Sequence, residues 1–178
     1  MALLVPSGTP VYLPGTDQFS VRKGFCEAAV GGFKIAPLKL KLNFLDNFAD
    51  VVEYDVPGVT LQGYDTTERA YDTTIAYDLP EAEVRFAYML MLMDLQRHGE
   101  DGALATNKLP NLFFKKNKEG TRFTVSLTWF ELTKAQHEDI GRHSARVDDC
   151  HWVIAARPRS LLGHRSVGTR TFVPVKTR

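Results

Sequence analysis

Histidines, carboxylates and a cysteine gather late in the chain and form its densest set of metal-ligating side chains. On a helix, Asp139 and His143 share a face, whereas His137 and His143 lie about 240° apart around the axis. The two histidines do not converge on one ion, so a solvated helix and a polar turn are the favoured interpretation. The set is His137, Asp139, His143, Asp148, Asp149, Cys150 and His151.

The adjacent residues Cys150 and His151 are of the types that act as nucleophile and base in thiol catalysis. Neighbouring residues of a strand point to opposite faces, so this imidazole would not reach the thiol. The chain has two cysteines, and a disulfide between Cys26 and Cys150 is an open alternative to two separate thiols.

The common catalytic motifs are missing from the sequence. It contains no P-loop, no dinucleotide-binding glycine fingerprint, no nucleophile elbow and no His-Glu-x-x-His. We therefore predict no catalytic residue, no cofactor and no metal. An enzyme with an unrecognised site near His137, His143, Asp148 and His151 is the least favoured alternative.

Six basic residues and no acidic ones occupy the last part of the chain, from residue 150 onward. Such a segment can contact a nucleic-acid backbone or an acidic protein surface. We take four of its arginines as candidate interface residues: Arg157, Arg159, Arg165 and Arg170.

Tyr88, Met89 and Met93 are the other candidate interface residues. They belong to a helix predicted over 80–98, with Asp78 as its cap and Gly99 after its end. Its apolar side chains run almost all the way round, so it must be covered on most sides. Methionines there could form an adaptable groove for a partner, although core filling is the default role.

Strand patterns dominate the rest of the chain. Apolar and polar residues alternate over 38–44, the pattern of a half-buried strand, and 112–130 has the pattern of a hairpin with a turn at 117–120. Short strands are expected on either side of Pro57-Gly58 and over 151–156, and a short helix over 134–146. The tetrapeptide Tyr-Asp-Thr-Thr occurs at 64–67 and 71–74, which indicates a strand pair or coincidence.

These elements predict an α+β, β-rich fold. We expect an antiparallel β-sandwich or barrel with one long packed helix, 80–98, and one short helix, 134–146. The 178 residues fit a single domain, 1–178. Its ends read as a proline-rich extended arm, 1–20, and a basic arm, 157–178.

Charge is strongly segregated although the net charge is only +1. Residues 45–101 carry three Lys and Arg against thirteen Asp and Glu, opposite to the basic end of the chain. Complementary faces favour head-to-tail contacts between copies. The longest apolar run, Phe86 to Met93, is too short to cross a bilayer, and the first residues lack the basic region of a signal peptide. We expect no membrane partner.

The order of elements over about 45–130 resembles the tail-tube and related tube-forming proteins of tailed bacteriophages. The features are a strand, the Val56-Pro57-Gly58-Val59 turn, a strand pair, the Leu79-Pro80 helix start and the hairpin 112–130. The resemblance implies a subunit whose β-sandwich or barrel stacks in rings, found in the virion or in the host cytoplasm during assembly. No functional residue is carried over from it.

Together these features predict a non-enzymatic structural subunit that self-assembles into a homo-oligomer. A capsid, connector or baseplate subunit fits the same features as a tube subunit does. The expected partners are copies of the chain itself and other virion proteins. A nucleic-acid-binding module that uses the basic arm is the alternative.

Overall fold

The computed structural model describes residues 2–27, 38–79, 84–97, 99–131, 150–159 and 163–175, with the backbone alone at Glu131 and Cys150. Strands are the commonest element of this part of the chain. They are β1 (Leu4–Leu13), β2 (Thr16–Ser20), β3 (Leu38–Leu40), β4 (Val52–Val56), β5 (Val59–Thr66), β6 (Ala70–Tyr71), β7 (Asn111–Lys116), β8 (Arg122–Glu131), β9 (Cys150–Pro158), β10 (His164–Arg165) and β11 (Arg170–Pro174). The helices are the π-helix η1 (Arg22–Glu27) and the α-helices α2 (Leu42–Phe48), α3 (Asp72–Asp78) and α4 (Phe86–Leu95).

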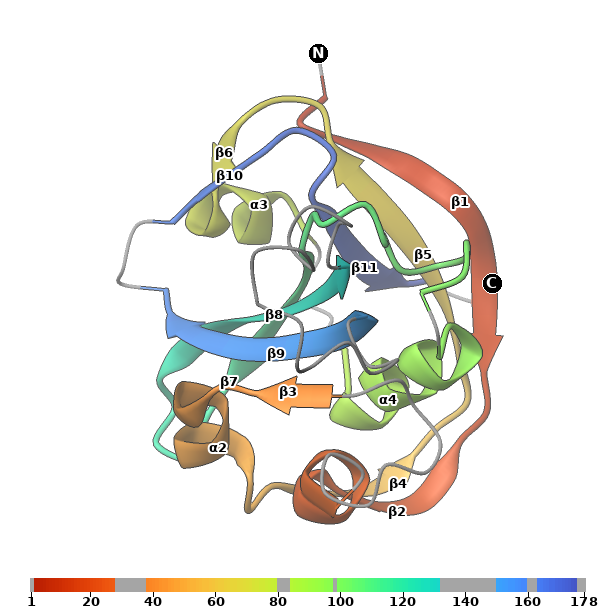
Figure 1. Cartoon of the computed structure of the whole chain (residues 1–178), viewed down its shortest axis with the longest axis vertical. Coiled ribbons are helices and arrows are strands. Elements are labelled where there is room, and N and C mark those ends of the chain that lie inside the picture. The colour runs from red at the N-terminus through yellow and green to blue at the C-terminus, as the bar shows by residue number, and fades with distance from the viewer. Residues whose placement is uncertain are drawn as a thin grey trace, which may run out of the picture.

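One seven-stranded sheet in the order β1-β5-β11-β7-β8-β9-β3 forms the centre of the molecule (Figure 1). Two small sheets, β10-β6 and β2-β4, accompany it. The fold is α+β and β-rich, as predicted, but the large sheet is mixed, because β11 pairs with β7 and β3 pairs with β9 in parallel. The expectation of a wholly antiparallel sheet is therefore wrong, and in the described strands the sheet is open, with β1 and β3 at its edges.

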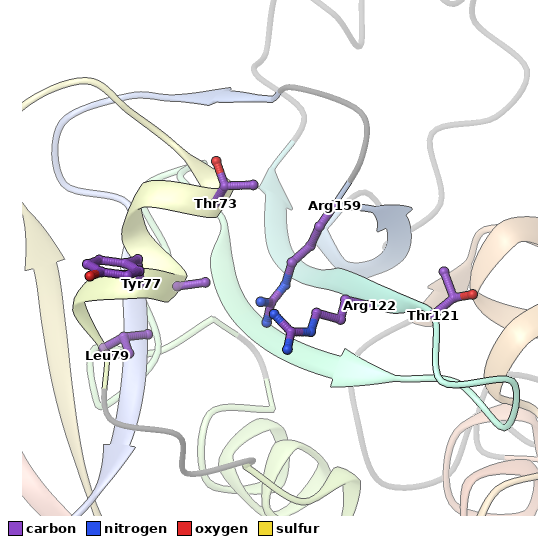
Figure 2. Close-up of a pocket in the computed structure, with 7 residues that line it drawn as sticks. Thr73, Tyr77, Leu79, Thr121, Arg122 and Arg159 are labelled. Carbon is purple, nitrogen blue, oxygen red and sulfur yellow. The ribbon is translucent and has the colours of Figure 1, made fainter.

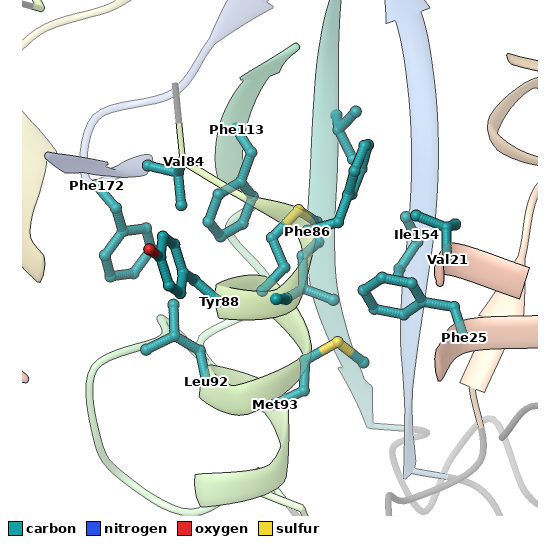
Figure 3. Close-up of a cluster of buried hydrophobic side chains, with 14 of the residues drawn as sticks. Val21, Phe25, Val84, Phe86, Tyr88, Leu92, Met93, Phe113, Ile154 and Phe172 are labelled. Carbon is teal, nitrogen blue, oxygen red and sulfur yellow. The ribbon is translucent and has the colours of Figure 1, made fainter. Parts of the chain in front are cut away.

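The main core lies between one face of this sheet and α4, α2 and η1 (Figures 1 and 3). Phe86 of α4 meets Phe44 of α2 with ring centroids 5.9 Å apart, and the side chains of Phe113 and Ile154 reach the same cluster from the sheet. Full burial of each such side chain stabilises the fold by about 1.5–3 kcal/mol.

A smaller core lies around Leu112, Ala70 and Ile75, with Phe114 packed against it. Leu112 and Phe114 alternate with Phe113 along β7, and Phe113 belongs to the main core. Since alternate strand residues point to opposite faces, α3 covers the face of the sheet opposite α4. This second face carries the candidate functional site.

The long helix is shorter than predicted. It spans Phe86–Leu95, Arg85 before it is extended, and residues 80–83 lie outside the described part of the chain. The prediction of Asp78 as its cap is wrong, because Asp78 is the last residue of α3. The amide groups of Phe86 and Ala87 instead donate to the buried carboxylate of Glu53, at 2.8 and 3.0 Å. A cap from a distant strand has no local sequence signature.

The strand predicted over 38–44 is correct only in its first half. β3 ends at Leu40, and α2 begins at Leu42, whose side chain is 70% exposed. Phe44 and Phe48 are one helical turn apart and both buried. Their spacing of four, and not the preceding alternation, sets the local structure.

Other predicted elements are confirmed. β7 and β8 form the hairpin, β9 covers the expected strand at 151–156, and β4 and β5 flank Pro57-Gly58. The two Tyr-Asp-Thr-Thr copies differ, because the first lies at the end of β5 and the second runs from β6 into α3. They are not a strand pair. The predicted helix 134–146 lies outside the described residues.

Both terminal segments take part in the fold of their own chain. The described residues of 1–20 are largely extended, as expected, but β1 pairs with β5 and β2 with β4. Within 157–178, β10 pairs with β6, and β11 lies between β5 and β7. Neither segment is a free arm where it is described. No described helix is both long and apolar enough to span a bilayer.

Candidate functional site: an arginine-lined groove

A groove of about 660 Å³ opens on the second face of the sheet, between α3 and the ends of β8 and β9 (Figure 2). We call it the arginine groove. Helix α3 and the residue after it form one wall, and the strand ends form the other. Its lining residues are Thr73, Ala76, Tyr77, Leu79, Thr121, Arg122 and Arg159.

Strand register brings Arg122 and Arg159 together. Phe123 of β8 pairs with Pro158 of β9, and one step further the amide of Arg159 donates to the carbonyl of Arg122 at 2.9 Å. The two arginines are thus cross-strand neighbours, and Figure 2 shows both side chains lining the groove. Like charges placed directly across a sheet are destabilising unless a counter-ion joins them.

Arg159 is held by an aromatic ring and not by an acid. Its guanidinium carbon lies 4.5 Å from the centroid of the Phe114 ring, and its buried Nε has no hydrogen-bond partner among the described residues. Burial lowers the pKa of the Arg159 guanidinium, and the charge of Arg122 lowers it further. Stacking fixes the plane of this cation while leaving its hydrogen-bonding capacity unused.

Arg122 is exposed at the start of β8. Among the described residues, no side chain forms an ion pair with Arg122 or Arg159. Asp72 is the acid whose charge acts on Arg159, but both of its carboxylate oxygens bind Arg165. The groove therefore carries two positive charges without a described counter-ion.

The other candidate arginines have different surroundings. Arg165 of β10 is paired with the buried Asp72, with Nη2 to Oδ2 at 2.8 Å. Arg170 of β11 binds Asp65 through Nε at 2.7 Å and Nη2 at 2.8 Å. Arg157 is exposed near the end of β9. The basic segment thus supplies Arg159 to the groove, whereas Arg165 and Arg170 serve internal ion pairs.

The three candidate residues of α4 are in the core (Figure 3). Met89 and Met93 are fully buried, and Tyr88 is nearly so. The Tyr88 hydroxyl donates to the carbonyl of Pro57 at 2.6 Å, and burial raises its pKa. A partner could not reach these side chains in this conformation, so the default role of core filling holds for both methionines.

The late set of potential metal ligands, for which no metal site is predicted, lies largely outside the described residues, from His137 to Asp149. His151 is buried in β9, with its ring stacked on that of Phe130 at 5.9 Å between centroids. The described part of the chain contains no group of three or more potential metal ligands. The alternative of a disulfide between Cys26 and Cys150 involves a side chain that lies outside the described part of the chain.

Sequence reasoning found Arg159 but missed Arg122 and the α3 wall. Arg122 alternates with apolar residues along β8, which is the ordinary pattern of a solvated strand face. The useful signal was the hairpin itself together with the strand that follows it, since an antiparallel β8-β9 pair sets basic residues opposite each other.

No protein-family model, curated protein or solved structure matches this chain, so its own residues carry the functional assignment.

Proposed function

We propose that this protein is a non-enzymatic structural subunit of a homo-oligomeric assembly, in which the arginine groove of one copy receives an acidic surface of the next. The observation that carries the proposal is the pair Arg122 and Arg159, which has no acidic partner among the described residues. Tyr77, at the rim of the groove, is 89% exposed. Arginine and tyrosine are the residues that most often dominate protein interfaces.

An acidic surface of matching charge lies on the β2-β4 pair. Asp17 and Asp55 fall between the register pairs Thr16↔Val56 and Gln18↔Tyr54, and both are exposed. No described residue forms an ion pair with either aspartate. Two carboxylates match the two guanidinium groups of the groove, and Tyr54 beside them is 61% exposed.

The two surfaces lie in different parts of the molecule, with the β2-β4 pair at the lower end of Figure 1 and α3 near the upper end. A contact between different surfaces is heterologous, so a pair of copies still has a free groove on one copy and a free acidic surface on the other. Repetition of such a contact gives a closed ring or a filament. This is the association expected of a tube or ring subunit.

A virion component of a tailed bacteriophage is the kind of assembly we propose, with other virion proteins as partners. Support comes from the β-rich fold and from the part of the resembling element order that the structure retains, namely β4, the Pro57-Gly58 turn, β5 and the β7-β8 hairpin. A β-sandwich or barrel as the architecture of the subunit, and a location in the virion or in the host cytoplasm during assembly, belong to the same proposal.

Light scattering coupled to size exclusion tests self-association. The wild-type chain should form oligomers at low ionic strength and dissociate at about 1 M salt, where the screening length falls to about 3 Å. Arg122→Gln should be monomeric at low salt. It should still fold, because it relieves the repulsion between Arg122 and Arg159.

The matched control is Arg97→Gln, which removes one exposed arginine charge at the end of α4. This variant should associate like the wild type. A wild-type monomer at low salt and high concentration would refute the proposal, and equal loss of association in both variants would remove the groove from it.

Nucleic-acid binding is the second candidate, favoured by the neighbouring arginines Arg122, Arg157 and Arg159 at the β8-β9 strand ends. Arg165 and Arg170 contribute little to such a surface, because their charges are neutralised internally. An oligonucleotide should bind with an affinity that falls steeply with salt, and Arg157→Gln should reduce that slope by about one. Binding that does not depend on salt would exclude this candidate.

A further inference from the structure

The arginines of the groove suit a phosphate ligand as well as the acidic surface of a second copy. The β8-β9 pairing makes the two cations Arg122 and Arg159 cross-strand neighbours, and the centroid of the Phe114 ring lies 4.5 Å from the guanidinium carbon of Arg159. In the described part of the chain, no acceptor meets the buried Nε of Arg159. A buried donor without an acceptor destabilises the free protein. A ligand that supplies the acceptor removes this penalty, which favours its binding.

We propose that the arginine groove binds the phosphate group of a small ligand between the guanidinium groups of Arg122 and Arg159. A phosphate or phosphate monoester offers at least three acceptor oxygens and close to two negative charges at neutral pH. Each guanidinium can donate two parallel hydrogen bonds to such a group. A single carboxylate offers two oxygens and one charge, and would leave one arginine uncompensated.

The size of the groove admits more than the phosphate itself. Its volume of about 660 Å³ lies within the range of small-molecule sites. The α3 wall offers the small or apolar side chains of Ala76 and Leu79 next to the cations. This arrangement suits a phosphate that carries an organic group, and inorganic phosphate is the minimal probe of the site.

Phosphate binding in the groove does not require self-association, but it would affect self-association. Phosphate and the acidic surface of a second copy would compete for the same two arginines. Phosphate should therefore dissociate the oligomer at an ionic strength at which chloride does not. This would make assembly sensitive to a phosphorylated ligand.

The test is a titration of the protein with inorganic phosphate at constant ionic strength, with chloride as the replaced salt. Binding is followed by amide chemical shifts at a protein concentration where light scattering shows a monomer. Shifts should centre on α3 and the β8-β9 ends, and Arg122→Gln should weaken binding at least tenfold. Arg159→Lys keeps the charge but loses the planar fork, and should also weaken binding about tenfold.

Arg97→Gln is the control and should bind phosphate like the wild type. Equal shifts with chloride, or unchanged phosphate affinity in both groove variants, would overturn the inference. A nucleoside monophosphate tested in parallel distinguishes the source of the phosphate, because tighter binding than inorganic phosphate assigns the rest of the groove to the organic group. If the chain binds phosphate but never associates, the phosphate site is supported and the assembly is refuted. If the chain associates but does not bind phosphate, the assembly is supported and the phosphate site is refuted.

Discussion

Arg170 shows that a residue of the basic segment can be neutralised by an acid of the same chain. Its Nε and Nη2 bind the carboxylate of Asp65, Nη2 also donates to the Ser7 hydroxyl at 2.6 Å, and Nη1 donates to the carbonyl of Ala103 at 2.9 Å. The ion pair joins β11 to β5 at residues that are register partners. A residue predicted as part of an external surface is thus an internal connection between two strands.

Replacing Asp65 with Asn should reveal this pair through its pH dependence. Burial by itself raises the pKa of the Asp65 carboxyl, but hydrogen bonds from Arg170 and Ser7 and the Arg170 charge bring it below its ordinary value. A lowered pKa in the folded state means that the carboxylate stabilises the fold above about pH 4, and that this contribution is lost as the pH falls through the lowered value.

Asp65→Asn should therefore lower the free energy of unfolding by about 2 kcal/mol at pH 7, and the deficit should shrink as the pH falls below the lowered pKa of Asp65. Urea denaturation at a series of pH values measures it. Asp46→Asn, at an exposed site on α2, serves as the control and should change stability little at any pH. A deficit that stays constant with pH would show that the pair does not form.

Residue type alone could not separate the arginines that matter for contact from those that do not. Arg159 and Arg165 both follow β9 and look equivalent in the sequence. The difference lies in Asp72, which meets Arg165 because β10 pairs with β6 immediately before α3. Such long-range pairing decides which charges remain for a partner.

At the scale of elements, α4 depends on a strand far from it in the sequence. Glu53 of β4 accepts the amide hydrogens of Phe86 and Ala87, and Lys115 of β7 lies 3.6 Å from the same carboxylate. The Lys115 ammonium also donates to the carbonyl of Val84 at 2.9 Å. This buried network fixes where α4 begins and attaches it to two strands.

Glu53→Gln should lower the free energy of unfolding by about 2–4 kcal/mol, because it removes the charge that caps the helix and that balances a buried ammonium. Urea denaturation measures the loss, and Glu68→Gln, at an exposed site after β5, is the matched control. A loss below about 0.5 kcal/mol, the level of ordinary surface substitutions, would contradict the assigned role.

Elements with local signals were predictable and those with non-local causes were not. The β7-β8 hairpin has its alternation and its turn residues within one short segment, so its sequence is sufficient. The starts of α4 and α2 depend on Glu53 and on the packing of Phe44 and Phe48 against the sheet. Local patterns carry no record of those partners.

At the scale of the molecule, folding neutralises part of the segregated charge within one chain. Asp65 and Asp72 of the acidic middle meet Arg170 and Arg165 of the basic end. The electrostatic case for assembly therefore no longer rests on whole segments. It rests on the arginine groove and on the acidic surface of β2-β4, which are smaller and can be altered one residue at a time.

The strand order explains why the sequence predicted a β-rich fold but not its topology. β11 enters the sheet between β5 and β7, and β3 joins β9 at the far edge, so segments distant in the chain become neighbours. Alternation identifies a strand and its buried face, but not the strand beside it. The same limit applies to the arginine groove, because α3 and the ends of β8 and β9 are brought together by the strand order of the sheet.

Mixing two complementary variants tests the proposed contact most directly. Arg122→Glu destroys the groove and keeps the acidic surface, whereas Asp17→Lys does the opposite. Asp17 is preferred to Asp55, whose backbone has a φ of 47°, a conformation that Lys adopts less readily than Asp.

Light scattering at low salt should find each variant monomeric and their equimolar mixture dimeric, because only one intact groove and one intact acidic surface can meet. The wild type should form larger species under the same conditions. Two variants that still assemble alone, or a mixture that stays monomeric beside an oligomeric wild type, would contradict a head-to-tail contact through Arg122 and Asp17.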